Sequence, residues 1–171
     1  MTDSLFKLTI DLRNKIICKE QFNALAGNTG DDRAFALSIL ADAISKRDSL
    51  NLAAGLSLAF EFGFSAEHLG LLISLVDADW HHSHEDVVWA LDKLGDLKSV
   101  DALFKATQIV PQYLAYDDTR ALASKAIWAL GNLNDKIADE KLRLLAESDC
   151  EVIKEDALEQ LERRASPGLA R

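Results

Sequence analysis

The sequence predicts an all-α fold, and three observations support this prediction. Eight glycines and two prolines among 171 residues are about half of the usual share of these two residues, which leaves few turns for a fold of many strands. Leu and Ala, which favour helices, fill much of the remainder. Apolar residues also recur along the whole chain with the 3.6-residue period of amphipathic helices.

The N-terminal part of the chain predicts three helices. The first starts near Asp3 and carries an apolar stripe formed by Leu5, Leu8, Leu12 and Ile16. A loop at 27–32 contains two glycines, and the helix after it extends to about Arg47. The next helix is predicted over 49–62, with Ser49 as its N-cap and Gly63 as its stop.

Six more helices are expected in the remainder of the chain. They are predicted at 66–77, 84–94, 98–110, 118–133, 137–147 and 150–164. Asp117 and Asp149 precede the fourth and the last of these helices, where a carboxylate suits the positive end of the helix dipole. The last residues, 166–171, are expected to form a flexible tail.

Two helix pairs repeat along the chain. Val88–Ala106 aligns with Ile127–Leu145 at an offset of 39 residues, with tryptophan on tryptophan. A looser copy covers Leu58–Leu72, and a half-copy covers Asp156–Leu161. Because one helix pair cannot bury its apolar side alone, such pairs must stack on one another. The repeat therefore predicts a short, right-handed α-solenoid.

The repeat resembles a known family pattern. The run ALDKLGDLKSVDAL, from Ala90 to Leu103, resembles the short bacterial HEAT-like repeat, A-L-G-x-I-G-D-x-x-A-V-x-x-L. It departs from that pattern at Asp92 and Ser99, and the second copy has Asn134 in place of the glycine between the helices. The resemblance covers 53–164 and implies stacked HEAT-like helix pairs. Residues 1–48 are expected to add divergent helices to the same single domain, 1–165.

Charge and hydropathy exclude several classes of partner. Nineteen Lys and Arg against 28 Asp and Glu give a net charge of −9, which argues against binding of nucleic acid or of anionic lipid. The chain lacks the roughly 18 to 20 uninterrupted apolar residues of a membrane helix. The start of the chain lacks the basic and apolar parts of a secretory leader. Cys18 and Cys150 fit unpaired thiols of a reducing cytosol, so a cytoplasmic protein without membrane contact is expected.

The segment 77–86 holds three of the four histidines and allows two interpretations. Glu85 lies four residues after His81 and three after His82, so one helix face could present two metal ligands. The repeats offer no further Cys or His to complete a ligand set, and no metal is predicted. Trp80, His82 and His84 are instead expected to form a hydrogen-bonding patch at an interface.

The two aligned tryptophans, Trp89 and Trp128, also allow two interpretations. Each lies about 200° around its helix from the leucine that anchors the core. They could be aromatic anchors of a binding groove, or they could pack between adjacent repeats. The inserted segment 111–118 carries Tyr113 and Tyr116 and could form a binding edge or cap the apolar end of a helix pair. Arg120 could join this edge or form a local ion pair.

The sequence contains no phosphate-binding glycine loop, nucleophile elbow or H-E-x-x-H motif, so neither catalysis nor a cofactor is expected. A helical repeat with an acidic surface is instead typical of a protein-binding module for a basic or neutral partner. The segment 82–86, the Tyr-Asp-Asp run and the Trp-Ala-Leu-Gly helix resemble immunity proteins of polymorphic toxins of the Rhs or type VI secretion kind.

This resemblance implies that the chain binds a cognate bacterial toxin and occludes its active site. The expected contact residues are Trp80, His82, His84, Glu85, Trp89, Tyr113, Tyr116, Arg120 and Trp128, with Glu61 and Asp156 adding electrostatic steering. Two alternatives stay open, namely a scaffold, adaptor or chaperone-like protein and a bilin lyase-like protein.

Overall fold

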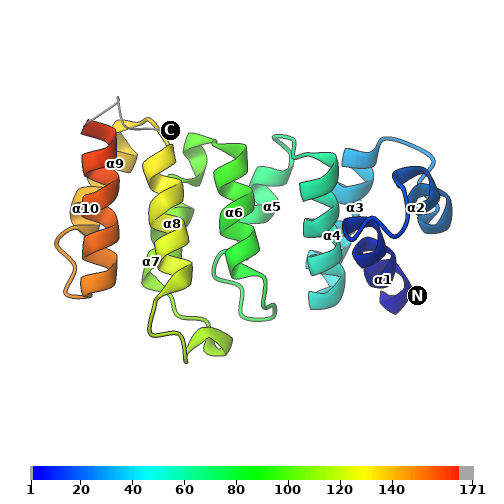
Figure 1. Cartoon of the computed structure of the whole chain (residues 1–171), viewed down its shortest axis with the longest axis horizontal. Helices are drawn as coiled ribbons and strands as arrows, with labels where there is room; N and C mark the ends of the chain where they lie inside the picture. Colours follow the sequence, from blue (N-terminus) through cyan, green and yellow to red (C-terminus); the bar gives the residue numbers. More distant parts are fainter. Residues whose placement is uncertain (1, 166–171) are drawn as a thin grey trace. The chain divides into compact units, whose positions relative to one another are not determined.

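The computed structural model describes the backbone of residues 2–165 and the side chains of residues 5–165. Within this range the chain forms ten α-helices, two short 3-10 helices and no strand (Figure 1). The all-α prediction is therefore confirmed. The flexible tail predicted at 166–171 lies outside the described residues. Among the described helices, none combines the length and the apolar character that crossing a membrane requires.

The helices belong to two compact units. The first consists of the residues up to Leu71 together with Trp80–Ser83, and the second of Leu72–Asp79 together with the residues from His84 onward. The prediction that residues 1–165 form one domain stays a prediction. The helices are α1 Thr2–Arg13, α2 Lys19–Ala26, α3 Asp32–Lys46, α4 Ser49–Phe62, α5 His68–Leu75, α6 His84–Leu94, α7 Val100–Gln108, α8 Ala121–Asn132, α9 Lys136–Leu145 and α10 Glu151–Ala165.

The first unit is built around α4, against which both α1 and α3 pack. Helices α3 and α4 approach closely because Gly55 has no side chain, and a Cβ there would lie 2.9 Å from Leu40 Cγ. Phe22 of α2 is fully buried and contacts the rings of Phe35 and Phe62. Aromatic side chains from three helices therefore close one side of this core.

Three predicted features of the first unit are wrong in detail. The first helix ends at Arg13, and Ile16 lies beyond it with 68% of its surface exposed. Helix α2, Lys19–Ala26, is a separate helix that the sequence pattern does not predict. The N-cap of α4 is Asp48 and not Ser49. The Asp48 carboxylate accepts hydrogen bonds from the backbone N–H groups of Leu50 and Asn51, at 3.1 and 3.0 Å.

Helix α8 is central to the second unit, where it packs against α6, α7, α9 and α10. Figure 1 shows α6, α8 and α10 side by side, with α7 and α9 behind them. Ala126, Leu130 and Leu133, in α8 and directly after it, form a buried stripe. In α6, Val87 and Leu91 are buried, whereas Leu94 is only half-buried.

Two boundaries in the second unit differ from the prediction. A 3-10 turn at Leu97–Ser99 precedes α7, which ends at Gln108. Helix α8 begins at Ala121 and not at 118, because the Asp117 carboxylate accepts hydrogen bonds from the backbone N–H groups of Thr119 and Ala121. These bonds hold a turn in which Arg120 has a left-handed backbone, with φ of 54°.

Candidate functional site

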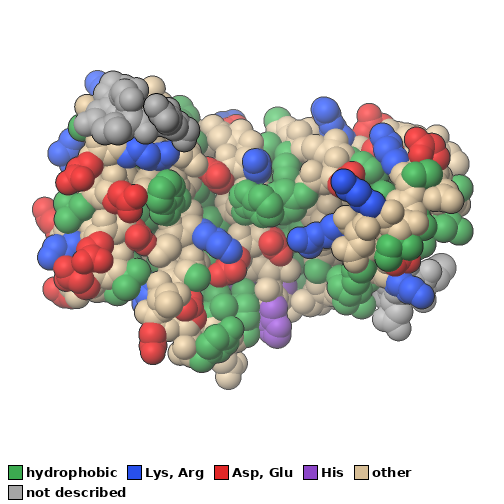
Figure 2. All heavy atoms as spheres, viewed as in Figure 1, with side chains coloured by type: hydrophobic (Ala, Val, Ile, Leu, Met, Phe, Trp, Pro, Cys, Tyr) green, Lys and Arg blue, Asp and Glu red, His purple; other side chains and the backbone are tan. Residues whose placement is uncertain are grey.

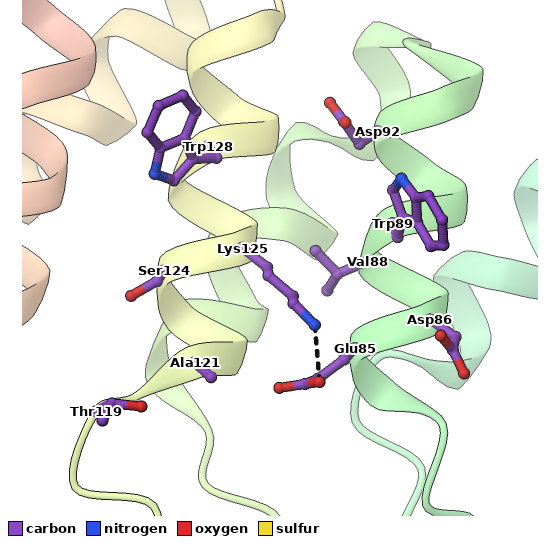
Figure 3. Close-up of a pocket in the computed structure, with 10 residues that line it drawn as sticks. All are labelled: Glu85, Asp86, Val88, Trp89, Asp92, Thr119, Ala121, Ser124, Lys125 and Trp128. Atoms are coloured by element: carbon purple, nitrogen blue, oxygen red, sulfur yellow. Dashed lines mark hydrogen bonds and ion pairs between the residues drawn. The ribbon is translucent and has the colours of Figure 1, made fainter.

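A groove of about 710 Å³ opens between α6 and α8 of the second unit (Figure 3). Its lining residues come from successive turns of both helices and from the turn before α8. They are Glu85, Asp86, Val88, Trp89, Asp92, Thr119, Ala121, Ser124, Lys125 and Trp128. Residues three and four apart share one face of a helix, so the spacing of this set follows from two helices lying side by side.

Both tryptophans line the groove, and Trp128 also packs against a neighbouring helix. Trp89 is 49% exposed and Trp128 is 41% exposed, so each indole is partly in solvent. Trp128 also packs between helices, because the guanidinium of Arg163 from α10 lies 5.2 Å from its ring centre. Lys93 Nζ lies 6.0 Å from the ring centre of Trp89. Both indoles line the groove while a cation of the chain covers part of each.

Two polar contacts join α6 to α8 on either side of the tryptophans. Lys125 Nζ lies 2.8 Å from Glu85 Oε2 and crosses the groove from α8 to α6 (Figure 3). About two turns further along α6, Asn132 Nδ2 donates to Asp92 Oδ1 at 2.8 Å. Arg163 Nη2 donates to Asn132 Oδ1 at 2.8 Å, which links this contact to α10. Two contacts between the helices therefore bound the part of the groove that the tryptophans line.

The two aligned repeats differ at the position where α8 packs most tightly against α10. In α8, Gly131 lies so close to α10 that a Cβ at this position would be 2.4 Å from Gln160 Oε1. The aligned residue in α6 is Asp92, whose side chain lines the groove and contacts Asn132. Glycine lets the Gln160 side chain of α10 pack against α8, whereas the aligned aspartate places a carboxylate in the groove between α6 and α8.

The second unit carries most of the net charge of the protein. Its described residues include nineteen Asp and Glu against eleven Lys and Arg, a net charge of −8, whereas the described part of the first unit has a net charge of −2. Figure 2 shows acidic side chains gathered over the α10 end of this surface, beside hydrophobic patches. Such a field favours encounter with a basic partner.

The histidine-rich segment does not form one exposed patch. His84 is only 3% exposed, and both its backbone N–H and its Nδ1 lie within hydrogen-bond distance of the Tyr113 hydroxyl, at 3.3 and 3.2 Å. Burial raises the pKa of Tyr113. In the first unit, His81 is buried and its Nδ1 accepts a hydrogen bond from the backbone N–H of Ser83, whereas His82 is exposed. Among the described residues, no three His, Cys, Asp or Glu side chains are grouped for a metal ion.

In the segment before α8, Tyr116 is exposed to solvent, whereas Arg120 contacts the neighbouring helix. Tyr116 is 81% exposed, which suits a contact residue. Arg120 is half-buried, and its Nη2 donates to the backbone carbonyl of Thr107 at the end of α7, 3.1 Å away. Hydrogen bonds from Thr119 and Ala121 lower the pKa of Asp117. Arg120 therefore holds the turn in place.

Of the eleven residues predicted from the sequence, three line the groove: Glu85, Trp89 and Trp128. Glu61 is exposed on α4 of the first unit, and Trp80, which belongs to the same unit, is half-buried. Asp156 is half-buried on α10, with Oδ2 enclosed. Sequence reasoning missed Asp92 and Lys125. Asp92 lies three residues after Trp89 and Lys125 lies three residues before Trp128, so helical spacing places each of them on the same face as a tryptophan.

Comparison with known proteins gave no match, whether with protein-family models, with curated proteins or with solved structures.

Proposed function

We propose that this protein is a protein-binding module whose contact surface is the groove between α6 and α8. The observation that carries this proposal is the pair of half-exposed tryptophans, Trp89 and Trp128, on neighbouring helices of one groove. Tryptophan is among the residues that dominate binding energy at protein interfaces. A half-exposed indole gains burial when a partner covers it, at about 25 cal/mol per Å² of apolar surface.

We further propose that the second unit is a short, right-handed α-solenoid of HEAT-like helix pairs. Support comes from the parallel row of α6, α8 and α10, with α7 and α9 in a second layer, and from the aligned repeats. In such an array one row of helices forms a continuous surface for binding. The α6–α8 groove lies in one row of this kind.

We propose a cognate bacterial toxin as the partner, bound in the cytoplasm so that its active site is occluded. The sequence resemblance to immunity proteins supports this proposal, and so does the acidic second unit, since opposite charge speeds association with a basic toxin. In this function the chain inhibits by contact and needs neither a cofactor nor a reaction of its own.

Co-expression with the product of the neighbouring gene tests this function. We expect the chain to restore growth of cells that express this product and to co-purify with it. Trp89→Ala should lose both effects while the far-UV circular dichroism spectrum stays unchanged. Leu144→Ala is the matched control, because Leu144 is 58% exposed on α9 and does not line the groove.

The outcomes separate the competing functions. Growth rescue that depends on Trp89 supports the proposal. Co-purification without rescue would instead indicate a scaffold or adaptor, and would overturn the inhibitory function. If neither rescue nor co-purification occurs, the toxin proposal is abandoned. Equal loss of binding in Leu144→Ala and Trp89→Ala would show that the groove is not the contact surface.

A further inference from the structure

One carboxylate of the groove lacks a cation among the described residues. Asp92 accepts a hydrogen bond from the neutral amide of Asn132, and no Lys or Arg pairs with it. Glu85, by contrast, pairs with Lys125 at 2.8 Å. In Figure 3 the Asp92 carboxylate points from α6 toward α8, one turn along α6 from Trp89. A negative charge therefore stands at one end of the groove that the two indoles also line.

Contacts within the chain show what these aromatic surfaces accept. The guanidinium of Arg163 lies 5.2 Å from the Trp128 ring centre, and the ammonium of Lys93 lies 6.0 Å from that of Trp89. Arginine stacks on aromatic rings and also offers a planar pair of donors to a carboxylate. A second cation could therefore satisfy Asp92 and lie against an indole at the same time.

Charge also selects among the possible occupants of the groove. The second unit has a net charge of −8 over its described residues. A second copy of the same chain would bring a like charge to this surface, which opposes association. A basic segment of a different protein would be attracted to it.

Building on the proposed function, we infer that the groove binds an arginine-bearing segment of the partner protein. The guanidinium pairs with Asp92 in the same way as Lys125 pairs with Glu85. An apolar neighbour of this arginine packs against Val88 between the two indoles. Asp92 is the residue that selects a cationic segment over a neutral one.

A pair of labelled peptides tests this inference on the full chain. One peptide alternates leucine and arginine, and the other carries citrulline at each arginine, which keeps the shape and removes the charge. Fluorescence anisotropy gives the dissociation constant of each. We expect the arginine peptide to bind at least fivefold more tightly, and to bind more weakly as salt is raised from 50 to 500 mM.

Substitution at Asp92 isolates the local contact. Asp92→Asn keeps the shape and the acceptor for Asn132 and should weaken the arginine peptide about fivefold, the equivalent of about 1 kcal/mol for a partly exposed ion pair. The same substitution should not change binding of the citrulline peptide. Glu140→Gln removes one charge from the exposed surface of α9 and should have little effect on either peptide.

Several results would overturn this inference. The first is equal binding of the two peptides, which would indicate a purely apolar occupant. The second is equal weakening by Asp92→Asn and Glu140→Gln, which would indicate only the overall charge. Indole signals that change on dilution of the protein alone would indicate a second copy in the groove. If Trp89→Ala weakens binding of the natural partner and Asp92→Asn does not, the proposed function stands and this inference fails.

Discussion

Replacing Gly131 by alanine tests the packing that distinguishes the two repeats. A Cβ at Gly131 would lie 2.4 Å from Oε1 and 2.9 Å from Cγ of Gln160, which is fully buried. Overpacking of this kind costs about 1–3 kcal/mol, and the better helix propensity of alanine returns about 1 kcal/mol. We therefore expect a net loss of about 1 kcal/mol, and a melting temperature lower by about 2–4 °C for a chain of this length.

Gly70→Ala is the matched control, since Gly70 is exposed in α5 and a Cβ there meets no atom within 4 Å. This variant should be stabilised by about 0.5–1 kcal/mol. Truncation of the obstructing side chain should restore the first variant. Neither amide atom of Gln160 has a hydrogen-bond partner among the described residues, so Gly131→Ala with Gln160→Ala should be at least as stable as Gly131→Ala alone. Thermal unfolding followed by circular dichroism would refute this reasoning if Gly131→Ala matched Gly70→Ala.

Three further predictions concern stability. Burial lowers the pKa of His68, so the unfolded chain takes up a proton near pH 6.5 that the folded chain still excludes. The contribution of His68 to the free energy of unfolding should be constant from about pH 7 upward and should be lost as the pH falls below about 6.5. The loss should be smaller in His68→Asn, which keeps an acceptor for the Ser65 N–H. Arg164 donates to three backbone carbonyls at the α8–α9 junction and pairs with Asp139. Arg164→Met should therefore lower the urea midpoint by the equivalent of about 3 kcal/mol. Arg143→Met, at an exposed position, is the control that should leave the midpoint unchanged. Trp89→Ala should lose only about 1 kcal/mol of stability, because half of its surface is already in solvent; a loss as large as that of a core residue would make it a packing residue.

Period and composition predicted the helices well because most of them bury one apolar stripe. In α8, for example, Ala126 and Leu130 lie on one face and both are buried. Helix ends were less accurate where side chains compete for the same backbone groups. Both Asp48 and Ser49 could cap α4, and only the structure shows that the carboxylate reaches the N–H groups.

The candidate site was predicted less completely because it depends on the distance between helices. Groove and packing both stayed open for Trp89 and Trp128 in the sequence, and the structure shows that both indoles line the groove with about half of their surface exposed. The sequence predicts His84 as an exposed contact residue, yet it is buried and lies within hydrogen-bond distance of the Tyr113 hydroxyl, 29 residues away. Nothing local in the sequence places two such distant residues together. Asp92 was noted as a departure from a repeat pattern, and its place in the groove depends on α8.

The most direct test of the groove as the contact surface is the ¹⁵N–¹H spectrum of the three indole N–H groups, recorded with and without the bound partner. The signals are assigned by single Trp→Phe variants. We expect the signals of Trp89 and Trp128 to shift when the partner binds, and the signal of Trp80 to stay in place. A shift of Trp80 alone, with the two groove signals unchanged, would contradict the account and would place the contact on the histidine-rich segment.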